Sequence, residues 1–359
     1  MVSNYKIFQS KILYIFFVFL SLNIFFFSTT KVESKPFDID NIEISKPFEI
    51  NFNKNMVIDE GFKKAFSKLI SLILNSSDQD KINQIKLNEI KGMVETFSIK
   101  EEKFIDEIYY MNLGVSFNKK KVFNFLEQKN IFPSIPLNKK IFFLPVIIDE
   151  NKKELLVFSN NIFFTQWNKK LKNSQLLEYI LPTEDLEDLN LIKNKFENIE
   201  QYNFEEIVTK YNLEDSIIAL IFKNEKEVRV LSKVIISDNV ILKNQSFDNI
   251  NISDLSEVDK IIDDLKILYE DHWKNFNQVN TSIRLTLNIM IKNSNNFKTS
   301  YFEKVLNEID LVYDFFITKF DKNFIYYQII YNGTPKNFLE IMNKKNYNFN
   351  TQNKVWLLQ

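Results

Sequence analysis

The strongest hydrophobic pattern in the chain is one continuous apolar run near its start, Ile12–Phe27, preceded by Lys6 and Lys11. A positively charged stretch followed by an apolar stretch is typical of an export signal. A helix of this length spans roughly 24 Å, which is shorter than the hydrocarbon core of about 30 Å. Residues 1–34 are therefore predicted to be a signal peptide or a membrane anchor.

The pattern leaves open whether this segment is removed. Val32-Glu33-Ser34 supplies a small residue at a cleavage position, whereas an intact Ile12–Phe27 would tether the chain to the inner membrane. The lysines place the start of the chain in the cytoplasm in both cases. We therefore expect the remaining residues to work outside the cytoplasm, in a bacterial periplasm, either soluble or tethered.

Residues 35–150 alternate between helical and extended periodicities, which predicts a first mixed α/β unit. Phe48, Ile50 and Phe52 alternate with polar residues and indicate a strand. Apolar residues at helical spacing, and runs of β-formers, predict the other elements: helices at 59–74, 80–103 and 119–128, and strands at 108–117 and 141–148.

Residues 151–280 predict a second α/β unit. It begins with a strand at 155–158 and a helix at 161–171, and short helices follow at 188–196 and 204–211. Three strand patterns separated by turn residues come next, at 216–222, 228–236 and 240–247, and a long helix at 256–276 closes the unit.

Residues 281–359 predict a third unit with the order β-α-β-β-α-β, which is the ferredoxin-like split βαβ arrangement. Its expected elements are strands at 283–291, 311–318 and 323–331, helices at 301–309 and 335–345, and closing strands at 347–350 and 354–358. The predicted fold class is thus α+β, with several small mixed α/β units in tandem.

Charge and cysteine content narrow the function classes. The chain has 46 basic and 47 acidic residues, and its only two arginines are Arg229 and Arg284. This charge balance gives no strong positive field, and two arginines are too few for the bidentate contacts that usually bind phosphates and bases. No nucleic-acid partner is therefore expected. The chain has no cysteine. Disulfides, thiolate metal sites and a lipoprotein anchor are therefore excluded.

Candidate catalytic residues are few. His272 is the only histidine, so no site with two histidines is possible. Val258, Ile262, Leu265 and Tyr269 precede it at helical spacing, which favours a histidine packed at the edge of a core over a catalytic base or a pH switch. The four glycines do not form the glycine-rich motif of a phosphate-binding loop.

Two acidic clusters are the remaining candidates. Glu184, Asp185, Glu187 and Asp188 could hold a hard cation such as calcium, but acidic residues are also expected where a helix begins. The second cluster consists of Glu101, Glu102, Asp106 and Glu107. It could supply paired carboxylates for hydrolysis, but acidic side chains on a solvent-exposed face explain it better. We predict no catalytic, cofactor-binding or metal-ligating residue and no cofactor.

Several short segments resemble a proteobacterial envelope family described as a domain of unknown function. These are Glu60–Leu69, Asn112–Phe117 and Leu181–Asp188. Tyr211–Ile218 resembles a step that this family shares loosely with the N-terminal domain of the Tol system β-propeller protein and with the curli secretion channel protein. The resemblance covers roughly residues 45–250. The chain departs from it by lacking an Arg near the start of the first helix and the usual glycines.

The resemblance implies an envelope role and brings no catalytic residues with it. Together with the export signal, it leads us to expect a non-enzymatic periplasmic assembly or binding scaffold whose partners are other envelope proteins. Two alternatives stay open. One is a carboxylate-dependent hydrolase of an envelope polymer, and the other is a periplasmic sensor of a small ligand.

Overall fold

The computed structural model describes residues 37–169, 175–225, 227–293 and 296–359. The predicted signal or anchor, Ile12–Phe27, lies outside these residues. Within the described ranges, none of the helices combines the length and the apolar character that crossing a bilayer requires. The fold is α+β, as predicted, with helices distributed among three separate sheets.

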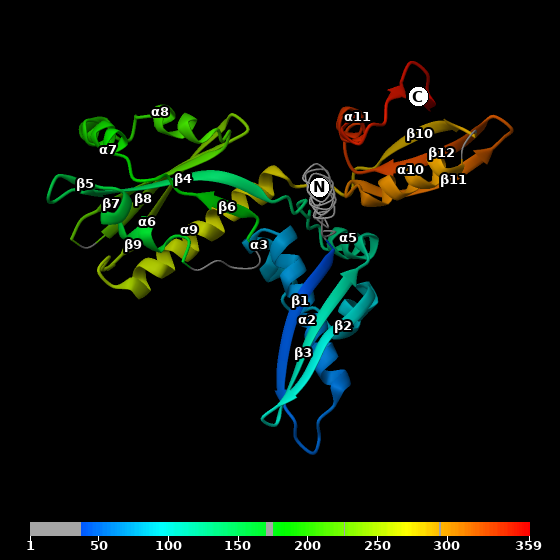
Figure 1. Ribbon diagram of the computed structural model, residues 1–359, viewed down its shortest axis with the longest axis horizontal. Coiled ribbons are helices and arrows are strands. Elements are labelled where there is room, and N and C mark those ends of the chain that lie inside the picture. Colours follow the sequence, from blue (N-terminus) through cyan, green and yellow to red (C-terminus); the bar gives the residue numbers. More distant parts are fainter. Residues whose placement is uncertain (1–36, 170–174, 226, 294–295) are drawn as a thin grey trace, which may run out of the picture. The chain divides into compact units, whose positions relative to one another are not determined.

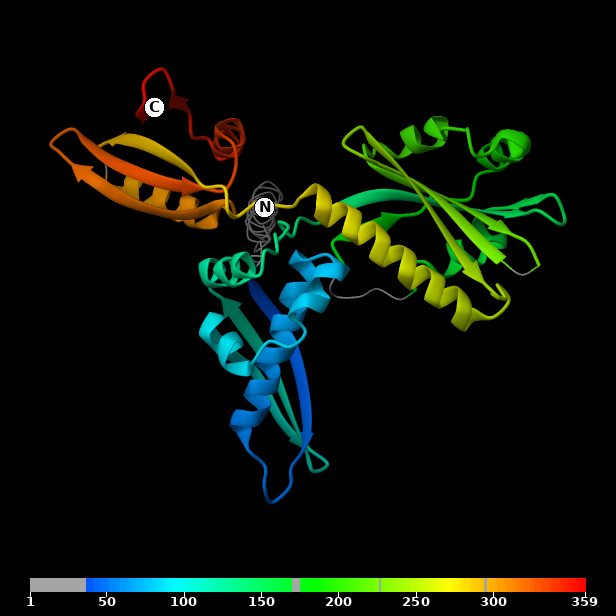
Figure 2. The same cartoon turned by 180° about the vertical axis from the view of Figure 1, so that it is seen from behind.

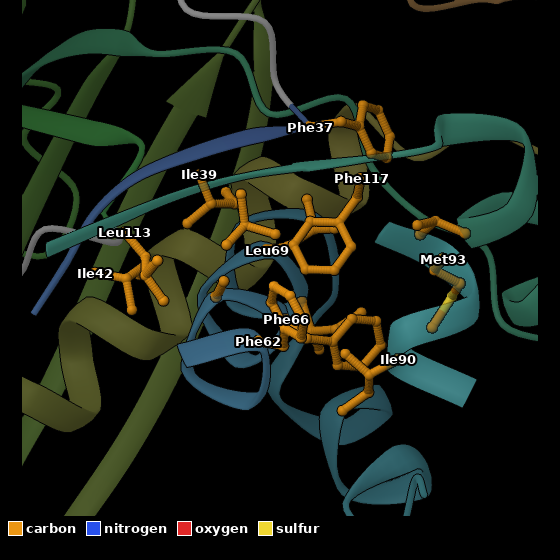
Figure 3. Close-up of a cluster of buried hydrophobic side chains, with 14 of the residues drawn as sticks. Phe37, Ile39, Ile42, Phe62, Phe66, Leu69, Ile90, Met93, Leu113 and Phe117 are labelled. Atoms are coloured by element: carbon orange, nitrogen blue, oxygen red, sulfur yellow. The ribbon is translucent and has the colours of Figure 1, made fainter. Parts of the chain in front are cut away.

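The first sheet has three antiparallel strands in the order β1-β3-β2. These are β1 (Asp38–Pro47), β3 (Ile108–Phe117) and β2 (Val94–Ile105). The long helix α2 (Lys54–Ile73) packs its apolar stripe on one face of this sheet, and the short helices α4 (Leu87–Met93) and α5 (Lys119–Gln128) complete the core. Figure 3 shows Phe62, Phe66 and Leu69 of α2 in this core.

Two predictions for this region are wrong. The strand expected around Phe48, Ile50 and Phe52 lies upstream, at β1, because a bulge at Asn41 (φ 57°) interrupts the two-residue alternation of its buried side chains. The helix expected at 80–103 ends early: α3 (Ser76–Gln79), a 3-10 turn at 80–82 and α4 are followed by β2. β2 buries neither face, so its sequence carries no alternation.

The middle sheet has six strands, ordered β5-β4-β7-β8-β9, with β6 pairing the first part of β4. β4 and β7 run parallel and are buried on both faces, whereas β8 and β9 continue as antiparallel strands. The strands are β4 (Lys139–Asp149), β5 (Glu154–Leu156), β6 (Leu177–Ile180), β7 (Ser216–Lys223), β8 (Glu227–Ile236) and β9 (Asn239–Asp248).

Helices cover both faces of the middle sheet, as Figures 1 and 2 show. The long α9 (Leu255–Phe276) and the short α6 (Ile162–Gln166) pack on one face. Helices α7 (Leu186–Lys193) and α8 (Glu205–Val208) lie over the other face. β4 belongs to this sheet rather than to the first one, so the sheet begins before the predicted boundary at residue 150.

The third sheet follows the order β11-β12-β10-β14-β13. Its elements appear in the chain in the predicted order, including the two short closing strands. The last strand, β14, pairs parallel with β10, and β13 pairs antiparallel with β14. The ferredoxin-like assignment of the closing strands stays a prediction. The elements are β10 (Leu285–Lys292), α10 (Asn296–Glu308), β11 (Val312–Phe320), β12 (Phe324–Tyr331), α11 (Pro335–Lys344), β13 (Phe349–Asn350) and β14 (Trp356–Leu358).

Candidate functional site

His272 lies on α9, half-buried, beside the apolar stripe that the sequence predicts. The buried stripe runs through Leu265 and Tyr269 but continues to Trp273 instead of His272. Burial lowers the pKa of His272, and the ammonium of Lys243 on β9 lowers it further. Its buried Nε2 atom has no hydrogen-bond partner in the described part of the chain. The imidazole is therefore a neutral packing group at neutral pH.

The acidic cluster at 184–188 caps a helix. Asp185 is the N-cap residue of α7, where its Oδ1 accepts from the Glu187 N–H at 2.7 Å. This backbone hydrogen bond lowers the pKa of Asp185. The buried Asp188 pairs with Lys210 at 2.7 Å, and Glu184 accepts from the Ser159 N–H. Among the described residues, no cluster of three or more ligands could hold a metal ion.

The second acidic cluster lies on β2 and its turn, not at the end of a helix. Glu102 accepts from the ammonium of Lys54 at 2.8 Å and from the Tyr109 hydroxyl at 2.5 Å. Asp106 and Glu107 form the two-residue turn into β3, both with positive φ, as such hairpin turns require. These carboxylates shape an exposed hairpin.

Three buried charges on α9 were not predicted from the sequence. Lys266, Glu270 and Lys274 are spaced four residues apart, and each is at most 6% exposed. Their spacing continues the row that begins at Ile262, which is the signal that could have revealed them. Burial raises the pKa of Glu270 and lowers that of Lys274.

Each of the three charges binds backbone atoms. The Lys266 ammonium donates to the Trp167 carbonyl at 2.7 Å, and the Lys274 ammonium donates to the Ser71 carbonyl at 2.6 Å. The Glu270 carboxylate accepts from the N–H groups of Leu176 and Leu177 at 2.8–3.2 Å. These charged side chains therefore hold the start of β6 and the end of α6 against α9.

A buried aromatic cluster surrounds this row. Phe143 stacks on Trp167 with ring centroids 3.8 Å apart, and the Tyr269 hydroxyl shares a 2.7 Å hydrogen bond with the Ser232 hydroxyl. The Tyr179 hydroxyl and the Trp167 Nε1 are buried without a partner in the described residues. The surroundings are close-packed side chains, so this part of the molecule has the character of a core.

The arginines are both occupied. Arg229 stacks on Phe222 at 4.0 Å and binds Glu200 at 2.9 Å, and Arg284 stacks on Tyr313 at 4.1 Å. A guanidinium engaged on an aromatic face and a carboxylate is not presented to phosphates. In the described residues, the arginines thus serve packing.

The sheet edges are the candidate binding surfaces in the described part of the chain. Each of the three sheets has an edge strand that carries solvent-exposed apolar side chains: β2, β9 and β11. Natural edge strands are usually protected by charges, prolines, bulges or covering elements, because their free N–H and C=O groups invite further strands. The exposed side chains are Phe97, Phe104 and Ile105 on β2, Val240 and Leu242 on β9, and Phe316, Ile317 and Phe320 on β11.

β11 is the most apolar of these edges. Phe316, Ile317 and Phe320 are 44%, 49% and 65% exposed, and we name these three residues the β11 patch. The strand pairs with β12 along its other side, with a register shift between Ile317 and Lys319. Successive strand residues point to opposite faces, so the patch exposes apolar groups on both faces of the sheet.

Comparisons with known proteins are sparse. No family model matches the chain, and no curated protein matches it. One solved structure, described as an uncharacterized protein, is 10% identical, with 40% of this chain and 95% of that chain covered and a TM-score of 0.18. At this TM-score the similarity carries no argument.

Proposed function

We propose that this chain is a non-enzymatic binding scaffold of a bacterial cell envelope, which holds partner proteins at its sheet edges. The observation that carries the proposal is the β11 patch, where Phe316, Ile317 and Phe320 are exposed on an edge strand. Exposed apolar side chains on an edge strand favour pairing with a strand of another chain. The buried charges on α9 support a structural role for that helix.

The envelope location rests on the sequence alone. Lys6, Lys11 and Ile12–Phe27 form the predicted export segment. Sequencing the start of the mature protein tests this part. A start near Lys35 means a soluble periplasmic protein, and an intact Met1 in the membrane fraction means a tethered one. An intact Met1 in a soluble cytoplasmic fraction would contradict export.

The scaffold function is tested by placing a photo-crosslinking amino acid at Phe316 in the full-length chain in living cells. The expected result is one discrete adduct, whose partner is then identified by mass spectrometry. The matched control carries the same group at Lys336, an exposed residue at the start of α11. Equal adducts at both positions, or none at Phe316, would contradict the proposal.

A charged variant sharpens the same test. Ile317→Lys and Phe320→Lys change only exposed side chains, so the sheet is expected to stay folded. The double variant should lose the adduct formed at Phe316, because lysine on an edge strand opposes strand addition. An adduct that persists unchanged in the folded variant would mean that the β11 patch does not bind the partner.

A further inference from the structure

A shallow groove of about 490 Å³ lies between β1 and α2 in the first unit. One wall is the edge strand, with Asn41, Ile42 and Glu43. The other wall is one stripe of the helix, consisting of Lys64, Ser67, Lys68 and Ser71. The spacing of three, four and seven residues places these four side chains on one face of α2. The groove therefore runs along the open side of a sheet.

Within the described ranges, the outer edge of β1 is open to a further strand. In the described residues, β3 is the only strand that pairs with β1. The outward carbonyls of Glu43 and Asp40 are met only by lysine ammoniums, Lys64 at 3.4 Å and Lys68 at 3.2 Å. These distances are longer than the usual 2.9 Å of a strand hydrogen bond. The backbone N–H groups of an added strand would replace such contacts favourably.

The floor of the groove is rigid. Ile42 is buried and pairs in register with Leu113 of β3, and Figure 3 shows both side chains in the core beneath α2. Gly61 of α2 allows the helix to approach this part of the sheet closely. Neither wall is a loop, so the groove is already formed before a segment binds. Little binding free energy would therefore be lost in ordering the groove.

The charged side chains that line the groove indicate which kind of segment it would bind. Two lysines face one carboxylate, that of Glu43, within the groove. Glu60 engages Lys64 at 3.4 Å but binds Lys46 more closely, at 2.8 Å. The only contact of the Lys68 ammonium within the described chain is the Asp40 carbonyl. The groove is therefore suited to negative side chains.

The spacing of the lysines refines this inference. Residues four apart on a helix rise by about 6 Å, and alternate residues of a strand lie about 6.6 Å apart on the same face. Two acidic residues separated by one position in an added strand would thus meet Lys64 and Lys68 together. The residue between them would point to the opposite, solvent-exposed face of the sheet.

We propose that the groove between β1 and α2 binds an extended acidic segment of a partner protein, which adds to β1 as a fourth strand and presents an acidic-x-acidic pair to Lys64 and Lys68. The inference rests on the proposed scaffold function, but it concerns an edge separate from the β11 patch.

The test begins with random nine-residue peptides displayed against the purified full-length chain. We expect enrichment of sequences with acidic residues at alternate positions. An enriched peptide should slow amide hydrogen exchange at Ile42–Lys46, and methylation of its backbone nitrogens should abolish binding. Absence of enrichment, or enrichment of sequences without alternating acidic residues, would overturn the proposal.

Charge reversal supplies the decisive comparison. Lys64→Glu with Lys68→Glu should weaken binding of the enriched peptide by about tenfold or more, because like charges would then meet. The matched control is Lys63→Glu, which reverses an exposed charge on α2 outside the groove and should leave affinity unchanged. Equal affinities for both variants would overturn the inference. The crosslinking result at β11 would stand independently, so the two failures are distinguishable.

Discussion

Gly61 of α2 lies directly against the side chain of Leu113 on β3. A Cβ atom added at Gly61 would come within 2.3 Å of Leu113 Cδ1 and 2.9 Å of Ile44 Cδ1. Leu113 is completely buried, so its side chain can move aside only by repacking its neighbours. The absence of a side chain at this one position therefore sets how closely α2 packs on the first sheet.

Gly61→Ala should lower the free energy of unfolding by up to about 2 kcal/mol. Overpacking a core costs about 1–3 kcal/mol, and the helix propensity of alanine recovers only about 1 kcal/mol. Chemical denaturation measures the difference. Gly92→Ala in α4 is the matched control, because nothing lies within 4 Å of its added Cβ atom. That variant should be neutral or slightly more stable.

A double-mutant cycle isolates the contact. Leu113→Val removes the Cδ atoms that a Cβ atom at Gly61 would strike. The penalty of Gly61→Ala should therefore be smaller in the Leu113→Val background. An identical penalty in both backgrounds would show that the close approach of α2 does not depend on this pair.

Glu270 provides a second prediction, since its carboxylate accepts from the N–H groups of Leu176 and Leu177. Glu270→Ala leaves both buried donors unpaired and should cost about 2–4 kcal/mol. Glu270→Gln keeps one oxygen that can accept from both groups and should cost less than half as much. Thermal and urea denaturation of the two variants give the comparison. Equal losses would mean that the acceptor atoms do not stabilise this region.

The sequence predicted the regular elements well where a face is buried. β3, α5, β7, β8 and α9 lie where their apolar periodicity places them. It failed at β2, whose long exposed strand has no hydrophobic alternation and is held by pairing with β3. Tertiary pairing, not local sequence, determines such an edge strand.

The roles of the candidate site residues were likewise predictable only where the interaction is local in sequence. Asp185 caps its helix as the acidic pattern predicts, because capping is a local interaction. The partners of Lys266, Glu270 and Lys274 are backbone atoms at least about ninety residues away. No local pattern identifies such partners, so charged residues on a helix look solvent-exposed in the sequence. The edge strands likewise become visible only once the strand order is known.

His272 predicts a pH dependence of stability. Burial and Lys243 lower its pKa from the ordinary value of 6.5, with Asp271 acting in the opposite direction. The unfolded chain therefore binds a proton at a higher pH than the folded chain does. Stability should fall as the pH drops below about 6.5, until the lowered folded pKa is passed.

His272→Gln removes this titration. The variant's free energy of unfolding should therefore change less with pH between the folded and the unfolded pKa of His272. Urea denaturation of both proteins across pH 5–8 measures the difference, which cancels the carboxylates common to both. If the slopes of wild type and variant coincide, the imidazole is equally accessible to protons in the folded and unfolded states.

Asn332 provides the last prediction, because it is a buried polar side chain at the end of β12. Neither its Oδ1 nor its Nδ2 has a partner in the described residues, although its backbone N–H donates to the Leu311 carbonyl at 2.8 Å. A buried amide without hydrogen bonds costs about 1–3 kcal/mol. Asn332→Leu keeps the branching and removes the polar atoms, so it should raise the free energy of unfolding by about 1 kcal/mol. Asn332→Asp introduces a charge at the same place and should destabilise strongly. A loss of stability with leucine would show that the amide has a partner in solution, such as a bound water molecule.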